Sequence, residues 1–497
     1  MKAIVLVLLA SAAQAAIRLP ALISDNMVLQ QRMPVRIWGS ATVGEEVTVS
    51  LGLTSVKAYT QEDGRFEVFL PPLNAGGPYD MTIAGSNTIT IRNVLIGEVW
   101  VASGQSNMVW PLRSSTNAEK EIAAANYPQI RFFQVRTTVS ATPQSDVTDA
   151  AWKLCTPENA PGFSGVGYFF ARHLLETRGV PIGILQSAVG GTPAQAWTRH
   201  EALFDDLNLH WYLDNWEKAV KRYPEQKEKY EQALAKFKAD AAAAKAAGKA
   251  APRAPAVPQG APGHPHSPSG LYNGMIAPLV DYGIRGAIWY QGEANAGPTD
   301  NELYRRLFAA MILDWRKQWG QGQFPFLWVQ LASFNPPGRE WAPIRDSQTA
   351  TLELANTGQA LAIDVGEPND IHPKDKLTVG TRLALVARAV AYGERIEYSG
   401  PVQRGVTRER NALRIWFDHT GSGLASKQGQ PLTGFRISNS DGRFFKAEAM
   451  IDGNTVVLSS PLVKEPVFAR YAWENDPTAN LMNKEGLPAV PFRTDGK

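Results

Sequence analysis

One serine of this sequence follows an apolar run that predicts a buried strand, and the end of such a strand can expose a side chain to a ligand. Residues 99–102 are a short apolar run, and the run breaks at residues 103–108, Ser-Gly-Gln-Ser-Asn-Met, with Ser106 inside the break. A buried parallel strand can present a nucleophile in this way at its carboxyl end. Because a free serine hydroxyl is a poor nucleophile at neutral pH, it needs a general base and donors for an oxyanion. The next step is therefore to find those partners in the chain.

Histidine is the base that serine catalysis needs, and one of the seven histidines is placed to serve. His372 lies in a loop after a predicted strand at residues 360–364, and Pro373 stiffens the backbone behind it. His264 and His266 fall in a proline-rich stretch where we expect nothing to hold them. The other four lie in a predicted helix, beside a helical segment or at a β turn: His173, His200, His210 and His419. Elimination therefore selects His372.

A pair of glycines follows another predicted strand. Residues 182–186 are strand-like, and the chain then breaks at residues 187–193, which include Gly190 and Gly191. Glycine lets the backbone approach a ligand closely and point its N–H group inward. The turn is a candidate oxyanion site, although an ordinary strand-to-helix turn has the same pattern.

A third loop carries two amides and a carboxylate. Residues 291–295, Gln-Gly-Glu-Ala-Asn, follow the apolar strand predicted at residues 287–290. The side-chain amide of Gln291 or Asn295 could donate to an oxyanion. Alternatively, Glu293 and the amides only cap and brace the next helix. All these loops follow predicted strands, and ligands bind at that edge of an open parallel sheet, so the loops predict one site.

The elements that position these loops alternate between strand and helix from about residue 96 to 395, which predicts a parallel sheet covered on both faces. Strands are expected at residues 99–102, 130–135, 182–186, 287–290, 326–331 and 360–364, and helices at residues 168–177, 302–319 and 377–392. Residues 16–95 and 396–497 alternate with period two and predict flanking β domains, sandwich-like at the C-terminus. Residues 201–270 interrupt the central domain with a helical segment and a proline-rich stretch, which we interpret as a mobile linker.

Length, charge and cysteine content limit the class of protein. A chain of 497 residues is too long for one core. A net charge of +3, with basic and acidic residues interspersed, gives no case for a nucleic-acid partner. The single cysteine, Cys155, excludes an internal disulfide and a metal site built on cysteines.

The first 15 residues have the pattern of a secretory signal. Lys2 is followed by a short apolar run, and Ala-Gln-Ala at residues 13–15 is a small-x-small cleavage site. The apolar run is too short to span a bilayer, which takes about 20 residues. We therefore expect a signal peptide at residues 1–15 and a secreted or periplasmic protein without a membrane span.

Four blocks of sequence resemble the SGNH hydrolases and, within them, the sialate O-acetylesterase family of carbohydrate esterases. The blocks are residues 104–108, 190–192, 289–295 and 371–376. The similarity extends over nearly the whole chain, the flanking β domains included. The resemblance implies an α/β fold, with an SGNH-type three-layer α/β/α hydrolase domain at residues 96–395, and it implies no metal or organic cofactor.

The resemblance also implies roles for individual residues. Ser106 would be the nucleophile and His372 the base. The backbone N–H groups of Ser106 and Gly191, with a side-chain amide from Asn295 or Gln291, would hold the oxyanion.

Two positions depart from the expected patterns. Met108 replaces the last glycine of a Gly-x-Ser-x-Gly elbow, which disfavours an α/β-hydrolase fold. The superfamily favours aspartate three residues before the histidine, where this chain has Asn369. Asp370 is the nearest carboxylate, and we expect it to orient His372. Asp364 and a Ser-His dyad are the alternatives.

These observations predict a serine carbohydrate O-acetylesterase that removes acetyl groups from sugar hydroxyls through an acetyl-Ser106 intermediate. Gln105 and Glu293 are expected to contact the substrate. Acetylated sialic acid and acetylated hemicellulose, xylan or xyloglucan, are both open as substrates. The alternative from another class is a non-catalytic carbohydrate-binding protein on a hydrolase core, disfavoured because Ser106 and His372 are both present.

Overall fold

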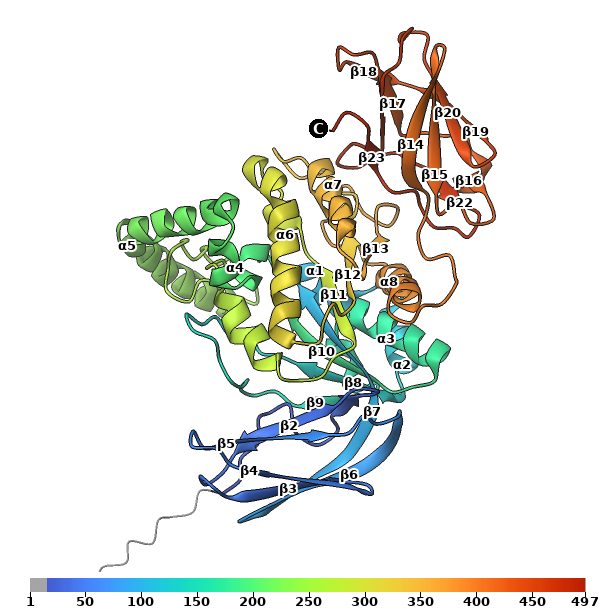
Figure 1. Ribbon diagram of the computed structural model, residues 1–497. Coiled ribbons are helices and arrows are strands. Elements are labelled where there is room, and N and C mark those ends of the chain that lie inside the picture. Colours follow the sequence, from blue (N-terminus) through green and yellow to red (C-terminus); the bar gives the residue numbers. More distant parts are fainter. Residues whose placement is uncertain (1–15, 497) are drawn as a thin grey trace, which may run out of the picture.

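A parallel sheet forms the centre of the molecule (Figure 1). The computed structural model describes residues 16–496, so the predicted signal peptide lies outside the described residues. The strand order is β13-β12-β11-β7-β10-β8-β9, and every pair is parallel except β8 with β9. The strands are β7 (Thr88–Gly104), β8 (Tyr127–Gln134), β9 (Trp152–Cys155), β10 (Ile182–Ala188), β11 (Gly286–Tyr290), β12 (Phe326–Gln330) and β13 (Thr357–Leu361). Five of the six strands predicted from the sequence are confirmed, the sixth lies at residues 357–361 instead of 360–364, and β9 is an additional edge strand.

Helices cover both faces of this sheet (Figure 1). α3 packs against α8, and α6 packs against α7. The helices of this part of the chain are α1 (Ser106–Val109), α2 (Ala118–Ala123), α3 (Gly165–Arg178), α6 (Pro298–Trp319), α7 (Ala342–Ala350) and α8 (Lys376–Val390). The predicted mixed α/β architecture is confirmed at this level.

The β-rich segment at the N-terminus continues directly into the central sheet through β7. The N-terminal half of β7 pairs with β6, and its C-terminal half pairs with β10 and β11. The other strands here are β1 (Val28–Gln30), β2 (Val35–Ser40), β3 (Glu46–Leu51), β4 (Thr54–Tyr59), β5 (Arg65–Leu70) and β6 (Gly76–Ala84). One hydrophobic core runs through both parts, so β7 crosses the predicted boundary after residue 95 without interruption.

The C-terminal segment has its own sheets and a second core, which also includes Leu361 and Ile363 from the end of β13 and the loop after it. Its two four-stranded sheets have the orders β14-β15-β20-β19 and β18-β17-β21-β23, and β16 pairs with β22. The strands are β14 (Val402–Glu409), β15 (Ala412–Asp418), β16 (Leu424–Ser426), β17 (Phe435–Ser438), β18 (Phe444–Lys446), β19 (Glu448–Asp452), β20 (Thr455–Ser459), β21 (Phe468–Tyr471), β22 (Leu481–Asn483) and β23 (Phe492–Arg493). Figure 1 shows this segment in red beside α7 and α8.

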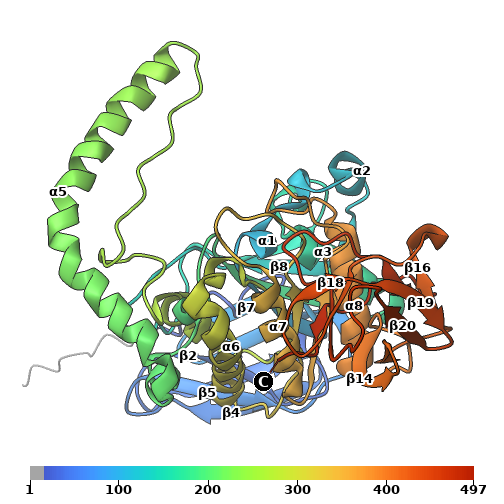
Figure 2. The same ribbon diagram turned by 90° about the horizontal axis from the view of Figure 1, so that it is seen from above.

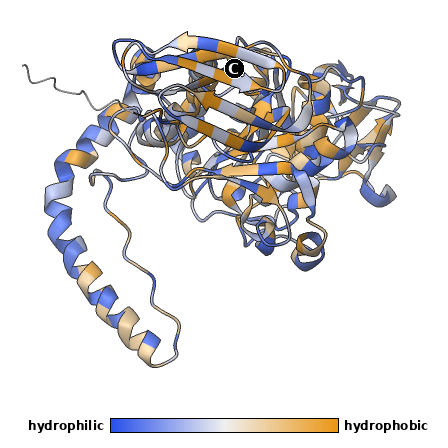
Figure 3. Cartoon of the chain, turned by 90° about the horizontal axis from the view of Figure 1, so that it is seen from below, coloured by the Kyte–Doolittle hydropathy of each residue, from blue (hydrophilic) through white to orange (hydrophobic). Residues whose placement is uncertain are grey.

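The insert consists of α4 (His200–Phe204), the long helix α5 (His210–Ala246) and a returning proline-rich strand of chain. Figure 2 shows α5 projecting from the body with the returning segment alongside it, and Figure 3 shows mostly hydrophilic residues over its middle turns. The expectation that nothing holds the end of the proline-rich stretch is wrong. Ala261 and His264 are buried, because the segment packs against the base of α5 before it re-enters the core.

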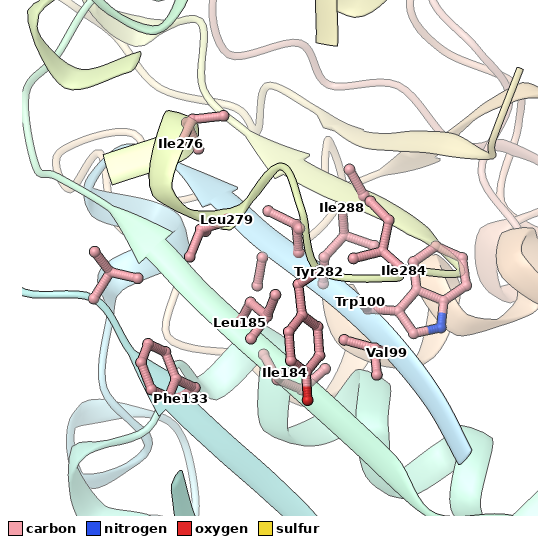
Figure 4. Close-up of a cluster of buried hydrophobic side chains, with 14 of the residues drawn as sticks. Val99, Trp100, Phe133, Ile184, Leu185, Ile276, Leu279, Tyr282, Ile284 and Ile288 are labelled. Carbon is pink, nitrogen blue, oxygen red and sulfur yellow. The ribbon is translucent and has the colours of Figure 1, made fainter. Parts of the chain in front are cut away.

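Large apolar side chains fill the space where β7, β10 and β11 pack under the segment before β11. Figure 4 shows Trp100, Leu185, Tyr282 and Ile288 among these side chains, which come from neighbouring strands and from that segment. This packing fixes the strand ends that carry the candidate site. Among residues 16–496, no helix is long and apolar enough to cross a membrane. In the same residues, no group of His, Cys, Asp and Glu side chains forms a metal-binding cluster.

Candidate active site

Ser106 begins α1 immediately after the end of β7. The turn between them is pressed against β11, because the N–H of Gln105 donates to the carbonyl of Tyr290 at 2.9 Å. Gly104 has φ +130°, and a Cβ there would lie 2.2 Å from the Tyr290 carbonyl oxygen. Only glycine fits this close approach, and the result is a half-buried Ser106 at the sheet edge.

The glycine turn after β10 lies beside Ser106. A Cβ on Gly190 would lie 3.5 Å from the Cβ of Ser106. Gly191 has φ +72° and open space around its Cα. Within residues 16–496, neither the Ser106 N–H nor the Gly191 N–H has a hydrogen-bond acceptor. Two free backbone donors therefore flank the serine.

His372 lies in the loop between β13 and α8, where its ring stacks on Trp110 with centroids 4.8 Å apart. The Asp370 carboxylate accepts the backbone N–H of His372 at 2.9 Å, and its Oδ1 lies 3.4 Å from the His372 Nδ1. Burial lowers the pKa of His372, the Asp370 carboxylate opposes that shift, and Lys376 adds to it. The imidazole is therefore neutral near pH 7 and able to accept a proton.

Asp364, the alternative partner, lies in a different environment. Both of its carboxylate oxygens accept from the Arg382 guanidinium, at 2.6 and 2.8 Å. Of the two carboxylates weighed from the sequence, Asp370 is the one in contact with His372.

A buried network of hydrogen bonds through Asn107 joins the loops that bear Ser106, Glu293 and His372. Its Nδ2 donates to the Glu293 Oε1 at 2.7 Å and to the carbonyl of Ile371 at 3.0 Å. Its Oδ1 accepts from the Lys376 ammonium at 2.6 Å. Burial raises the pKa of Glu293 and lowers the pKa of Lys376 to about 7.

Two members of this network, Asn107 and Lys376, were not among the site residues expected from the sequence. Both lie inside the blocks that carry the family resemblance, and that membership is the one signal that could have identified them. Lys376 is the first residue of α8, whose N-terminus is capped by the Asp375 carboxylate accepting the N–H of Thr378. This cap fixes the start of α8, where the fully buried Lys376 ammonium donates to Asn107.

The two amides considered for the oxyanion bind elsewhere in this structure. Gln291 donates from its Nε2 to Asn295 Oδ1 at 2.8 Å and to the Thr192 carbonyl at 3.2 Å. Asn295 donates from its Nδ2 to Gln195 and Asp300. Both side chains are fully buried. These bonds support the bracing interpretation of the third loop.

Gln105 and Glu293, expected to contact the substrate, are 3% and 4% exposed. The Gln105 Oε1 accepts the backbone N–H of Ala294 at 3.2 Å, which joins the first loop to the third. The Glu293 Oε2 has no hydrogen-bond partner among the described residues. Gln105 precedes Ser106 in the chain, and Glu293 accepts a hydrogen bond from the side chain of Asn107.

The two histidines assigned to a mobile linker are in fact held at the site's border. His266 Nε2 lies 2.9 Å from the carbonyl oxygen of Gly191, and its backbone N–H donates to the His264 Nδ1. The expectation that nothing holds them is wrong, because contacts with the glycine turn and with α5 order this end of the segment. The His266 ring contacts a backbone carbonyl of the glycine turn. The His372 ring instead contacts the Asp370 carboxylate.

Comparison with known proteins identifies the family of this chain. Residues 96–247 and 264–388 match the family described as carbohydrate esterase, sialic acid-specific acetylesterase. The sialate O-acetylesterase of Pongo abelii is 33% identical, with 96% of this chain and 92% of that protein covered. The sialate O-acetylesterase of Mus musculus is 31% identical, with 94% and 92% covered. The crystal structure of a carbohydrate acetylesterase from Xanthomonas citri superposes with a TM-score of 0.83 at 39% identity, covering 97% of this chain and 100% of that one. The chain therefore belongs to the sialic acid-specific acetylesterase family of carbohydrate esterases.

Proposed function

We propose that Ser106 is the nucleophile of this carbohydrate O-acetylesterase, with His372 as its general base and Asp370 as the carboxylate that orients His372. One observation carries the proposal. The Asn107 side chain, next to Ser106 in the chain, hydrogen-bonds the backbone of Ile371, next to His372. This bond joins the loop of the candidate nucleophile to the loop of the candidate base.

In the proposed reaction, the Ser106 Oγ attacks the acetyl carbonyl carbon while His372 Nε2 accepts the hydroxyl proton. Asp370 lies at Nδ1, which leaves Nε2 for the serine and stabilises the imidazolium. Collapse of the tetrahedral intermediate breaks the bond to the sugar oxygen, which takes the proton from His372. Water then attacks the acetyl-serine while His372 accepts its proton. The bond between the acetyl carbon and the Ser106 Oγ breaks, His372 returns the proton to Oγ, and acetate leaves.

The oxyanion donors in this proposal are the backbone N–H groups of Ser106 and Gly191, because both lack an acceptor among the described residues. Asn295 or Gln291 would have to release its present acceptors before it could donate to the oxyanion. Gln105 and Glu293 act in this proposal by positioning the loops, since both are almost fully buried.

The substrate we propose is an acetylated sugar hydroxyl, with acetylated sialic acid as the first candidate because the curated relatives carry that name. The test is acetate release from O-acetylated sialic acid, with 4-nitrophenyl acetate as a small ester control. Ser106→Ala should lower kcat by about 10³-fold or more on both esters while thermal unfolding stays unchanged. Full activity in that variant would refute the nucleophile.

We also infer that residues 1–15 direct export to the periplasm or beyond. The support is the sequence pattern alone. N-terminal sequencing of the protein recovered from the culture medium or periplasm should begin at Ala16. A mature chain that begins at Met1 would contradict export through this segment.

A further inference from the structure

A cavity of about 640 Å³ lies at the base of α5, between the insert and the loops that follow β10 and β11. This volume falls in the range of about 300–1,000 Å³ that is typical of ligand sites. On the side of the catalytic domain it is lined by Pro193, Gln195 and Ala294. On the other side it is lined by α5 and by the end of the returning segment, including His266. Figure 2 shows how α5 extends outward from this base.

Two contacts place the cavity next to the candidate active site. His266 lies in the cavity wall and its Nε2 is 2.9 Å from the Gly191 carbonyl, on the turn beside Ser106. Ala294 is also in the wall, and its N–H donates to the side chain of Gln105. The wall of the cavity is therefore in direct contact with the glycine turn and with the side chain that precedes Ser106.

Two tryptophans of α5 give the cavity flat apolar surfaces. Trp211 and Trp216 line it, and both are half-buried. The centroid of the Trp216 ring lies 5.9 Å from that of the His264 ring. Because His264 is buried, this contact holds the Trp216 ring in place. Half-buried indoles offer a large contact area to a ligand at a small cost in side-chain entropy. Such surfaces suit the faces of sugar rings.

The charged groups in the cavity wall are mostly cations. Lys218 and Arg222 come from α5 and Arg339 from the loop after β12, whereas Asp300 is the one carboxylate in the wall. None of the three cations forms an ion pair with any residue between 16 and 496. The Asp300 carboxylate accepts a hydrogen bond from the side chain of Asn295, and burial raises its pKa. Arginine pairs with carboxylates through two parallel hydrogen bonds, so these groups can bind an anionic ligand.

We propose that the insert forms a binding subsite for a sugar carboxylate of the same glycan that presents its acetyl ester to Ser106. The proposal rests on the proposed function of that site. The carboxylate can belong to the acetylated residue itself, as in a sialic acid, or to a neighbouring uronic acid in an oligosaccharide. In both cases the tryptophans hold the sugar ring and the cations select the charge. The role assigned to residues 201–270 is therefore substrate selection.

The experiment measures kcat and KM for four esters: O-acetylated sialic acid, an acetylated xylo-oligosaccharide bearing glucuronic acid, the matching neutral acetylated xylo-oligosaccharide, and 4-nitrophenyl acetate. The wild-type enzyme should prefer at least one carboxylate-bearing ester over the neutral one. Preference for the first or the second ester distinguishes the two sources of the carboxylate. Equal kcat/KM for charged and neutral oligosaccharides, together with no preference for the sialic acid ester, would overturn the proposal.

Arg222→Gln should raise KM for the preferred charged ester about 10-fold more than KM for the neutral esters, with kcat changed less than 2-fold. Lys229→Gln is the matched control, because Lys229 lies on the same helix outside the cavity wall. An equal effect of Arg222→Gln on charged and neutral esters would contradict the subsite. Trp216→Ala should raise KM for both oligosaccharides relative to 4-nitrophenyl acetate.

The subsite and the proposed nucleophile can fail separately. Ser106→Ala that retains full activity would refute the nucleophile, whatever the Arg222 variant shows. An Arg222→Gln enzyme with unchanged charge selectivity would refute the subsite even if Ser106→Ala is inactive.

Discussion

The Nδ2 of Asn107 lies 3.0 Å from the carbonyl oxygen of Ile371, and this hydrogen bond joins the loop that bears Ser106 to the loop that bears His372. Asn107 is 1% exposed, so water does not compete for the bond. The same amide contacts Glu293 and Lys376. A carboxylate and an ammonium buried on either side hold the amide in one orientation.

Removal of this amide should therefore impair catalysis more than binding. Asn107→Leu keeps the approximate size of the side chain but leaves the Ile371 carbonyl and Glu293 without their donor. Loss of a buried hydrogen bond of this kind costs about 1–3 kcal/mol, and we expect kcat for 4-nitrophenyl acetate to fall about 10- to 100-fold with KM changed less than 3-fold. Steady-state kinetics checks this. Asn369→Ala, an exposed asparagine in the loop that bears His372, is the control. An Asn107→Leu enzyme with wild-type kcat would show that the bond has no part in catalysis.

Two neighbouring aspartates should behave differently. Asp370→Asn removes the carboxylate at His372 Nδ1 and should lower kcat by about 10²–10⁴-fold, because the imidazolium loses its counter-charge and its fixed tautomer. Asp364→Asn removes the charge and one of the two acceptors of the Arg382 guanidinium and should instead lower the melting temperature with kcat changed less than 3-fold. Kinetics and thermal unfolding on both variants separate the two roles. A large kcat loss confined to the Asp364 variant would reverse the assignment.

The acid limb of the pH profile should report the pKa of His372. The base must be neutral to accept the serine proton, so kcat/KM falls as the pH falls through this pKa, which burial lowers from the ordinary value of histidine. The Asp370 carboxylate raises the pKa and the Lys376 ammonium lowers it. Asp370→Asn should therefore move the acid limb to lower pH, and Lys376→Met should move it to higher pH. Profiles of kcat/KM from pH 4 to 9 test the two opposite shifts, and a shift of both variants in the same direction would show that another group controls this limb.

The strands and loops of the site could be predicted from the sequence because each depends on local pattern. The runs at residues 99–102, 182–186 and 287–290 predict buried parallel strands, and these strands end in the structure at Gly104, Ala188 and Tyr290. Their polar successors lie at one sheet edge. The carboxyl ends of parallel strands meet there by geometry.

The partners of individual side chains depend on tertiary packing, and the sequence alone did not predict them. Nothing local marks the buried ammonium of Lys376 as a partner of Asn107, which is 269 positions away. The ordering of His264 and His266 also depends on distant contacts, since α5 and the glycine turn cover a segment without periodicity of its own. The amides of Gln291 and Asn295 were ambiguous for the same reason, because one polar pattern serves either an oxyanion or a buried brace.

Substitutions at two glycines of the site should have different effects, one on folding and the other on catalysis. Gly104→Ala would place a Cβ 2.2 Å from the Tyr290 carbonyl at φ +130°, and we expect little soluble protein. Gly191→Ala meets no atom within 4 Å, but its φ of +72° costs about 1–2 kcal/mol for a residue with a Cβ. That variant should fold with a slightly lower melting temperature, while relaxation of the turn misaligns the N–H proposed to bind the oxyanion and lowers kcat about 10²–10³-fold. Gly190→Ala, whose Cβ makes only ordinary contact at 3.5 Å, serves as the control for a substitution in the same turn. A folded Gly191→Ala enzyme with kcat close to that of the Gly190→Ala enzyme would remove Gly191 from the oxyanion site.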